Sequence, residues 1–261
     1  MLLSAMAVAA GAQELHVIES RWLHRNDSLL VFSPEGRCCQ RELPTLILLH
    51  GYGGDYAAWS RHTDLQALST ETGFRIICPD GFFDSWYMNN ADPSKMQWRR
   101  FFWEECWPML EQRYGLNPGR TFVDGLSMGG HGAMNLFLDH PERFRAAGSM
   151  SGILNLIYSG GSRDIIPSIL GVPDIEDGKC QGESAINRLG RLKETGSEGK
   201  LMVISCGTQD KFLPATETFE ARCREEGLRC IAIYSPAAHR WPYWVWVLPY
   251  HLQFFKEELG R

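Results

Sequence analysis

The 261-residue sequence predicts an α/β fold, with a mostly parallel central sheet flanked by helices in one domain over residues 13–261. Apolar, strand-like runs alternate along the chain with segments that carry apolar residues at helical spacing, an order typical of βαβ units. Several of these runs are apolar without interruption, as expected for strands buried on both faces of a sheet. We find no repeat, low-complexity tract or linker that would divide the chain.

Two strands that alternate in polarity, over 15–23 and 28–32, are expected at the edge of the sheet, joined by a turn at Asn26-Asp27. The segment 156–200 is irregular, with brief helical patches, and is expected to cover the active site. Further strands are expected at 46–49, 74–78, 121–123, 145–150, 201–205 and 228–234, and helices at 55–69, 104–114, 128–139, 217–226 and 244–258.

The composition is that of an ordinary globular protein, with 44% hydrophobic and 22% charged residues. The formal net charge of −5 gives no electrostatic support for a nucleic-acid or anionic-membrane partner. Outside the N-terminus, no stretch approaches the roughly 20 apolar residues of a membrane span. Neither a nucleic-acid partner nor a membrane span is therefore expected, and the sequence leaves the oligomeric state open.

The first twelve residues are small and apolar and end in Ala10-Gly11-Ala12, a small-x-small pattern typical of a signal-peptide cleavage site. They lack the positively charged start of such a leader, which is consistent with a truncated signal peptide. We expect a periplasmic or secreted protein, with a cytoplasmic enzyme as the alternative.

Eight cysteines form no Cys-x-x-Cys pair and have no histidine at zinc-ligand spacing. Cys78, Cys206 and Cys230 lie in or beside apolar strand-like runs, where cysteine usually acts as a small buried hydrophobe. The adjacent Cys38 and Cys39 are better candidates for a disulfide. Neither a metal nor an organic cofactor is expected.

The strongest motif is Gly125-x-Ser127-x-Gly129, which lies between the strand at 121–123 and the helix at 128–139. A serine on so sharp a strand-to-helix turn adopts an unfavourable backbone conformation, and glycines on both sides avoid a collision between strand and helix. The helix N-terminus also directs free N–H groups toward whatever reacts there. The motif predicts Ser127 as a nucleophile.

Two further reactive side chains follow predicted strands. Asp210 comes after the strand at 201–205, and His239 after the strand at 228–234. With Ser127 they give the chain order serine, acid, histidine of an α/β-hydrolase. In that arrangement His239 takes the serine proton, and Asp210 orients the imidazole and stabilises its protonated form.

Each of these assignments has an alternative. Asp210 could be a helix N-cap, and His239 a surface residue beside a proline turn. His251 is the rival base, but it lies within the terminal helix and is less free to reach Ser127. His131 is too close to Ser127 along the helix and is read as packing or pocket wall. His50 resembles a metal ligand, but no second ligand is suitably spaced.

A tetrahedral intermediate needs two aimed N–H donors for its oxyanion. The residue after the nucleophile, Met128, supplies one. The glycine-rich stretch after the strand at 46–49 suits the other, and we expect the Tyr52 N–H, with Gly51 and Gly53 as alternatives.

Five motifs follow one another along the chain. In chain order they are His50-Gly51-Tyr52-Gly53-Gly54, Pro79-Asp80-Gly81 with Ser85-Trp86-Tyr87, Gly125-Leu126-Ser127-Met128-Gly129-Gly130, Cys206-Gly207-Thr208-Gln209-Asp210 and His239-Arg240-Trp241-Pro242-Tyr243-Trp244. Together they resemble the esterase family of α/β-hydrolases over about residues 44–256. That family includes S-formylglutathione hydrolases, tributyrin-type esterases, feruloyl and acetylxylan esterases, and the mycolyltransferases. The resemblance implies the same triad and the same oxyanion donors, and it implies that Ser85-Trp86-Tyr87 belongs to a loop lining the acyl site.

The substrate is less well defined than the chemistry. Trp86, Trp241 and Trp244 lie near the expected site and suit an aromatic acyl group or a sugar face. With the leader, they favour acetyl, short-chain or feruloyl esters of carbohydrates over a glutathione thioester. An acyltransferase or an S-formylglutathione-type thioesterase on the same triad is the alternative, and a non-catalytic carbohydrate- or lipid-binding protein is a remote one. Expected substrate-binding residues are Gly51, Gly53, Ser85, Trp86, Tyr87, His131 and Trp241.

Overall fold

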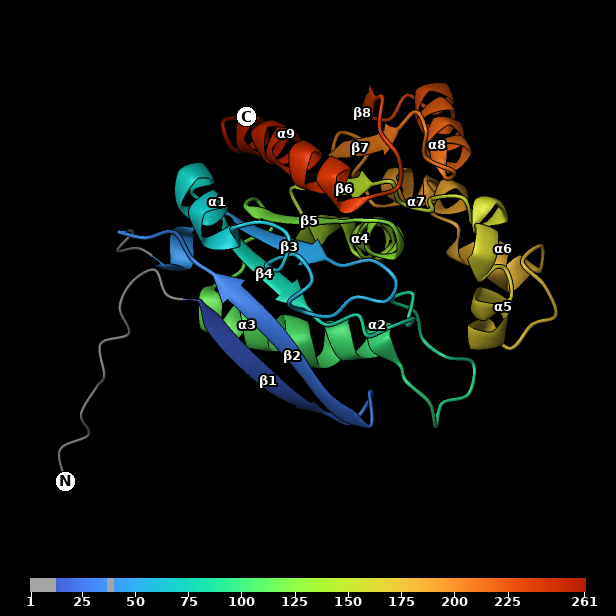
Figure 1. Ribbon diagram of the computed structural model, residues 1–261, viewed down its shortest axis with the longest axis horizontal. Coiled ribbons are helices and arrows are strands. Elements are labelled where there is room, and N and C mark those ends of the chain that lie inside the picture. Colours follow the sequence, from blue (N-terminus) through green and yellow to red (C-terminus); the bar gives the residue numbers. More distant parts are fainter. Residues whose placement is uncertain (1–12, 37–39) are drawn as a thin grey trace.

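A computed structural model describes residues 13–36 and 40–261 of the chain (Figure 1). The predicted leader at 1–12 and the proposed disulfide-forming pair Cys38-Cys39 lie outside these residues. The described residues form an eight-stranded sheet with strand order β1-β2-β4-β3-β5-β6-β7-β8.

The sheet is mostly parallel, as the sequence predicts. Only β1 and β2 run against their neighbours, and every pairing from β4 to β8 is parallel. The parallel strands β3 to β7 are buried along their whole length, which explains their largely apolar sequence. The strands are β1 (Glu14–Ser20), β2 (Arg25–Phe32), β3 (Thr45–Leu49), β4 (Arg75–Pro79), β5 (Thr121–Gly125), β6 (Ala146–Met150), β7 (Leu201–Gly207) and β8 (Cys230–Ser235).

Helices cover both faces of the sheet (Figure 1). On one face, α1 (Leu65–Thr72) and α9 (Trp241–Leu259) pack on alternate strand residues such as Leu48 and Phe122. The other face is covered by α2 (Trp98–Phe101), the π-helical η2 (Phe102–Cys106), α3 (Trp107–Tyr114), α4 (Met128–Asp139) and α8 (Leu213–Glu225). Within the described residues, none of the helices has both the length and the apolar character that a membrane span requires.

Three local predictions need correction. The turn between β1 and β2 lies at 21–24, and Asn26 and Asp27 pair with β1 inside β2, so β2 is not an edge strand. The predicted helix at 55–69 is replaced by turns up to residue 63, and α1 begins after Asp64, whose carboxylate accepts the Ala67 N–H. The helix expected at 104–114 begins at Trp98, because buried aromatic side chains in that first turn pack against the core.

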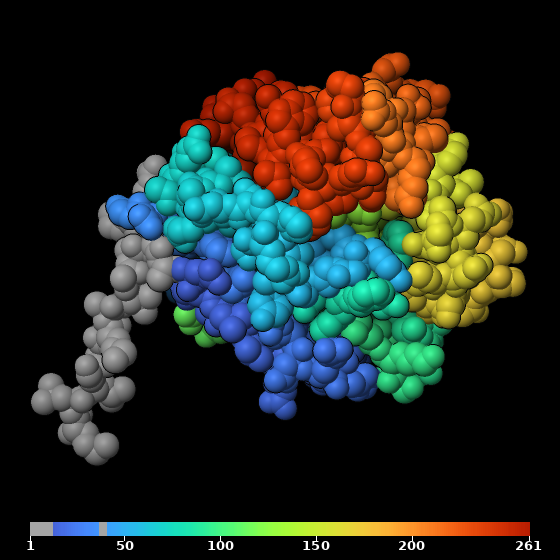
Figure 2. Space-filling view, in the orientation of Figure 1, coloured from blue at the N-terminus to red at the C-terminus, as the bar shows by residue number. Residues whose placement is uncertain are grey.

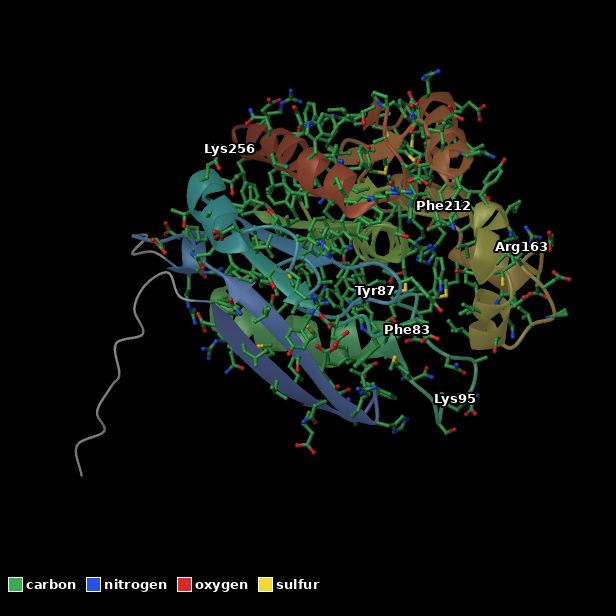
Figure 3. The ribbon with its side chains drawn as sticks, viewed as in Figure 1. Phe83, Tyr87, Lys95, Arg163, Phe212 and Lys256 are labelled. Atoms are coloured by element: carbon green, nitrogen blue, oxygen red, sulfur yellow. The ribbon has the colours of Figure 1, made fainter. Side chains whose placement is uncertain are left out.

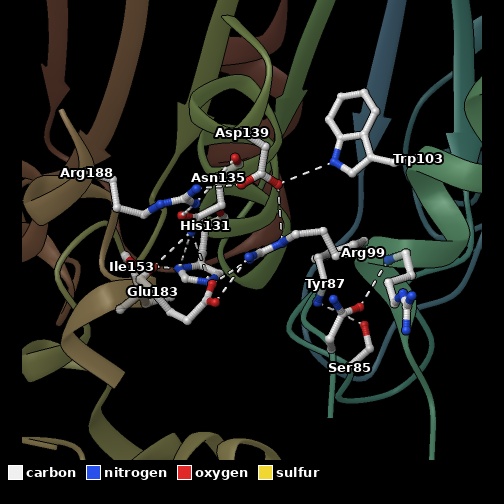
Figure 4. A network of polar contacts seen from close by, with 12 residues as sticks. Ser85, Tyr87, Arg99, Trp103, His131, Asn135, Asp139, Ile153, Glu183 and Arg188 are labelled. Carbon is white, nitrogen blue, oxygen red and sulfur yellow. Dashed lines mark hydrogen bonds and ion pairs between the residues drawn. The ribbon is translucent and has the colours of Figure 1, made fainter. Parts of the chain in front are cut away.

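The segment 156–200 consists of short helices, in agreement with its irregular sequence. They are η4 (Leu156–Tyr158), η5 (Gly160–Ser162), α5 (Ile165–Leu170), α6 (Gly178–Glu183), η6 (Ala185–Arg188) and α7 (Gly190–Glu194). Ion pairs fasten its second half to the body: Glu183 meets Arg99 of α2 at 2.6 Å, and Arg188 meets Asp139 of α4 at 2.5 Å (Figure 4).

The turn into α4 depends on a glycine at position 129. A Cβ atom there would lie 2.5 Å from the backbone oxygen of His50, which cannot move away. We expect Gly129→Ala to lower the free energy of unfolding by about 1–3 kcal/mol, as measured in urea. Gly182→Ala in α6, where a Cβ meets nothing within 4 Å, is the control. Equal stability of the two variants would contradict the close packing of strand and helix.

Candidate active site

Ser127 occupies the turn between β5 and α4 and has the unfavourable backbone angles expected of such a position, φ 53° and ψ −118°. Its N–H donates to the Met150 carbonyl at 2.9 Å, which ties the turn to the end of β6. The residue is 8% exposed, and α4 begins at the next residue. The hydroxyl therefore lies at a helix N-terminus, at the carboxyl edge of the sheet.

The structure brings Ser127, His239 and Asp210 together, although they are 112 and 29 positions apart in the chain. His239 Nε2 lies 2.9 Å from Ser127 Oγ, and His239 Nδ1 lies 2.7 Å from Asp210 Oδ2. Because a carboxylate only accepts, we assign the Nδ1 proton to the bond with Asp210, which leaves Nε2 to accept from the serine. The rings of Phe212 and Trp244 hold the imidazole edge-on.

Phe212, and not Asp210, is the N-cap of α8, but the Asp210 carboxylate still accepts a hydrogen bond from the backbone there. Its Oδ1 accepts the N–H of Phe212 at 2.9 Å just before α8 begins. Burial alone would raise the pKa of Asp210, but the hydrogen bond and charge of His239, together with the Phe212 N–H, outweigh burial and hold that pKa below its ordinary value of 3.8. The carboxylate is therefore ionised at neutral pH.

A cavity of about 830 Å³ opens above Ser127. It lies where the loop after β3, the beginning of the 156–200 segment and the start of α9 meet, coloured light blue, yellow and red in Figure 2. Its wall is largely aromatic and apolar, with three cationic residues. The lining residues include Gly51, Tyr52, Gly53, Arg61, His62, Trp86, Met128, Ile153, Ser159, Ile165, Lys211, Phe212, Arg240, Trp241 and Trp244.

Two residues that line this cavity, Tyr52 and Met128, have a backbone N–H without an acceptor among the described residues. The Tyr52 N–H makes no hydrogen bond within the described part of the chain, and Met128 is the first residue of α4, where an N–H has no intrahelical partner. The N–H of Gly53 is already used, since it donates to Phe83 at 2.7 Å. The geometry therefore favours Tyr52 over Gly53, while Gly51 stays an alternative.

Of the expected binding residues, Gly51, Gly53, Trp86 and Trp241 line the cavity, whereas Ser85, Tyr87 and His131 do not. The hydroxyl of Ser85 donates to the Gly81 carbonyl, and that of Tyr87 donates to the His50 carbonyl at 2.7 Å. Tyr87 thus lies in the interior of the protein, whereas Phe212, in the loop before α8, lines the cavity. Both residues are labelled in Figure 3.

His131 lies in a buried polar cluster behind Trp86. Burial lowers the pKa of His131 to about 4, so the ring is neutral, and it contacts Asn135, whose amide also donates to the Glu183 carbonyl (Figure 4). Its position indicates packing between α4 and the 156–200 segment.

The other two histidines considered from the sequence are engaged elsewhere. His50 Nδ1 donates to the Gly51 carbonyl at 2.8 Å, and its Nε2 accepts the Gly81 N–H at 2.7 Å, so the ring fastens two loops beneath the cavity. His251 bonds to Asp124 and Ser205 in the protein interior. Neither histidine is free to act on Ser127.

The sequence did not predict several residues that line the cavity, among them Ile153, Ile165, Lys211 and Phe212. Phe212 and Lys211 directly follow Asp210, and Ile153 follows β6, so their position after a parallel strand was the available signal. Ile165 lies in the 156–200 segment, for which only the tertiary structure gives a position.

An eight-stranded, mostly parallel sheet with a serine, histidine and aspartate hydrogen-bonded at its carboxyl edge defines the α/β-hydrolase class of proteins. The chain matches the family model described as "Putative esterase" over residues 20–255 and belongs to that family.

Solved structures agree with this fold. The chain is similar to a ferulic acid esterase, with a TM-score of 0.82, 20% identity and coverage of 97% of this chain and 100% of the other. An S-formylglutathione hydrolase from Agrobacterium tumefaciens gives a TM-score of 0.79 and 21% identity, with coverage of 97% and 98%.

By sequence, the chain is similar to a different group of proteins. The chain is 29% identical over 138 residues to the diacylglycerol acyltransferase/mycolyltransferase Ag85A of Mycobacterium leprae (strain TN), covering 49% of this chain and 40% of that protein. The chain spans less than half the length of the curated relatives it matches there.

Proposed function

We propose that this protein hydrolyses acyl esters of carbohydrates through an acyl-enzyme on Ser127. The observation that carries the proposal is the chain of hydrogen bonds from Ser127 through His239 to Asp210, at 2.9 and 2.7 Å, beside a cavity large enough for a substrate. A serine hydroxyl is a weak nucleophile, and an adjacent oriented base makes it reactive.

In the first half of the reaction, Ser127 Oγ attacks the ester carbonyl carbon while His239 Nε2 takes the hydroxyl proton. The negative charge that develops on the carbonyl oxygen is stabilised by the N–H groups of Tyr52 and Met128. When the intermediate collapses, His239 gives its proton to the leaving alcohol, and the acyl group stays on Ser127.

In the second half, water replaces the alcohol. His239 takes a proton from the water as it attacks the acyl carbon, and the same two N–H groups hold the new oxyanion. Cleavage of the bond to Ser127 releases the acid and restores the serine proton. Asp210, ionised because of its lowered pKa, stabilises the imidazolium in both halves.

The wall of the cavity supports acetyl, short-chain or feruloyl esters of carbohydrates as substrates. Trp86, Trp241 and Trp244 line it together with Tyr52, which is 47% exposed. Flat aromatic faces suit either a phenolic acyl group or the apolar face of a sugar ring. A substrate panel of acetyl, butyryl and feruloyl esters with S-formylglutathione separates these classes.

Transfer of the acyl group to a sugar hydroxyl is a second candidate, favoured by the similarity to Ag85A, an acyltransferase by name. The two candidates share every step up to the acyl-enzyme. They differ in the acceptor, so the ratio of free acid to transferred ester, measured with and without added sugar, distinguishes them.

The catalytic serine is tested directly with a fluorophosphonate, which reacts with a serine activated by a neighbouring base. We expect stoichiometric labelling, and peptide mass spectrometry should place the label on Ser127. Labelling should fail in protein unfolded in urea, because the activating histidine is then lost. A native protein that hydrolyses no ester and takes up no label would contradict the proposed function.

A further inference from the structure

A second serine–histidine–aspartate arrangement lies inside the protein, between the sheet and α9. His251 Nδ1 lies 2.7 Å from Asp124 Oδ2, and His251 Nε2 lies 2.9 Å from Ser205 Oγ. All three residues are fully buried, with 0% exposure. No substrate can reach them, so this buried network does not act as a second catalytic centre.

Each member of the buried network lies on a strand or helix that adjoins the loop holding one member of the triad Ser127, His239 and Asp210. Asp124 precedes Ser127 by three residues on β5. Ser205 lies on β7, which leads into the turn carrying Asp210. His251 lies on α9, which begins two residues after His239. The network therefore joins three segments that are distant in sequence but share the catalytic residues.

Hydrogen bonds from backbone N–H groups connect the buried network to the turn that holds Ser127. Asp124 Oδ1 accepts the Gly125 N–H at 2.7 Å, inside the turn that holds Ser127. The backbone oxygen of Ser205 accepts the Ser151 N–H at 2.6 Å, one residue after the Met150 carbonyl that accepts the Ser127 N–H. A shift of β7 or α9 relative to β5 would break bonds at both ends.

The intervening strand leaves room for this network. At position 148 of β6, a Cβ atom would overlap the Asp124 carboxyl group, so only glycine lets the side chain lie there. A buried carboxylate without partners is strongly unfavourable, and here Gly125 and His251 supply the partners. The polar groups are thus satisfied in one relative placement of β5, β7 and α9.

We propose that Asp124, His251 and Ser205 act as positioning residues, which hold β5, β7 and α9 where His239 reaches both Ser127 and Asp210. This inference rests on the proposed function. A displacement of about 1 Å between reacting groups costs roughly 100-fold in rate, so loosening the network should lower kcat. It should leave KM nearly unchanged, because none of the three residues lines the cavity.

The test compares two buried serines. Ser205→Ala removes one bond of the network, and we expect kcat for p-nitrophenyl acetate to fall about 10-fold with KM within twofold. The matched control is Ser69→Ala in α1, whose equally buried hydroxyl donates to the Phe32 and Phe74 carbonyls, away from the triad. Ser69→Ala should keep kcat within twofold, even where urea unfolding shows the same loss of stability.

A conservative variant adds a rescue. In Asp124→Asn, the amide oxygen can still accept the Gly125 N–H, and the amide nitrogen can donate to His251 Nδ1. The imidazole then adopts its other tautomer and donates from Nε2 to Ser205. We expect kcat within about threefold of the wild type, against a fall of about 100-fold in Asp124→Ala.

The outcomes are separable. If the wild type turns over esters but Ser205→Ala and Ser69→Ala lose the same kcat, the positioning inference is wrong and the proposed function stands. A loss in Asp124→Asn as large as in Asp124→Ala would also overturn the inference. If the wild type itself neither turns over an ester nor reacts with a fluorophosphonate, the proposed function fails.

Discussion

Replacing Ser127 with alanine should reduce the turnover of p-nitrophenyl acetate by about a million-fold, the loss seen when the nucleophile of a serine hydrolase is removed. The hydroxyl is the only group within hydrogen-bonding distance of His239 Nε2 among the described residues, so no neighbour can replace it. Initial rates at saturating substrate, corrected for spontaneous hydrolysis, measure the effect.

The folded state of Ser127→Ala should be intact, because the alanine can keep the N–H bond to the Met150 carbonyl. Ser168→Ala, at an exposed position of α5, is the control and should keep full activity. A Ser127→Ala protein with activity above about a thousandth of the wild type would point to a different nucleophile.

Asp210→Asn should lower kcat by about 10⁴-fold while leaving the fold in place. The amide oxygen can still accept the Phe212 N–H, so the entry to α8 is preserved. The amide nitrogen, however, donates to His239 Nδ1 and forces the proton onto Nε2. An Nε2–H cannot accept the Ser127 proton, and the base is lost. A single-turnover assay and circular dichroism measure activity and folding separately.

The matched control is Asp174→Asn, at an exposed position where the carboxylate also accepts the N–H of the residue two positions on, Glu176, at 3.0 Å. It should keep kcat within twofold. Asp124→Asn should be tolerated where Asp210→Asn is not. His251, the partner of Asp124, takes no part in proton transfer, so either tautomer of its ring serves. Equal activity of wild type and Asp210→Asn would remove Asp210 from the mechanism.

The pH profile of the wild type gives a further check on the assignment. Because the pKa of Asp210 lies below 3.8, its carboxylate stays ionised from pH 8 down to about pH 5. A loss of kcat on acidification between about pH 8 and pH 5 is therefore not caused by protonation of Asp210. Loss of kcat from that cause is expected only below this range, with the active form at the higher pH. An Asp210-dependent loss above pH 5 would contradict this assignment.

The sequence alone predicts the parallel part of the sheet, and it selects Ser127, Asp210 and His239, which the structure brings within hydrogen-bonding distance. Uninterrupted apolar runs reveal buried strands, and a strand followed by a reactive side chain places that side chain at one edge of the sheet. Gly125 and Gly129 reveal the turn at Ser127, because a Cβ at either position would overlap backbone atoms. These signals are local, so they survive without knowledge of the fold.

Local signals failed where distant residues decide the structure. In sequence, Asp55 resembles a helix N-cap, but the helix begins after Asp64, where Leu65 of α1 packs into the hydrophobic core. Tyr87 and His131 were expected to line the site but lie in the interior, Tyr87 against Gly132 of α4 and His131 where α4 meets the 156–200 segment.

His251 is the clearest case. In the sequence it is a rival base on a helix. No motif near it in the chain indicates contact with Asp124 or Ser205, which are 127 and 46 positions away. Chain order and spacing determine which residues can react, because that chemistry is written in short motifs. Only the packing of α9 across β6 decides which of two histidines meets Ser127 and which is sealed in the core, because burial and contact are properties of the assembled chain.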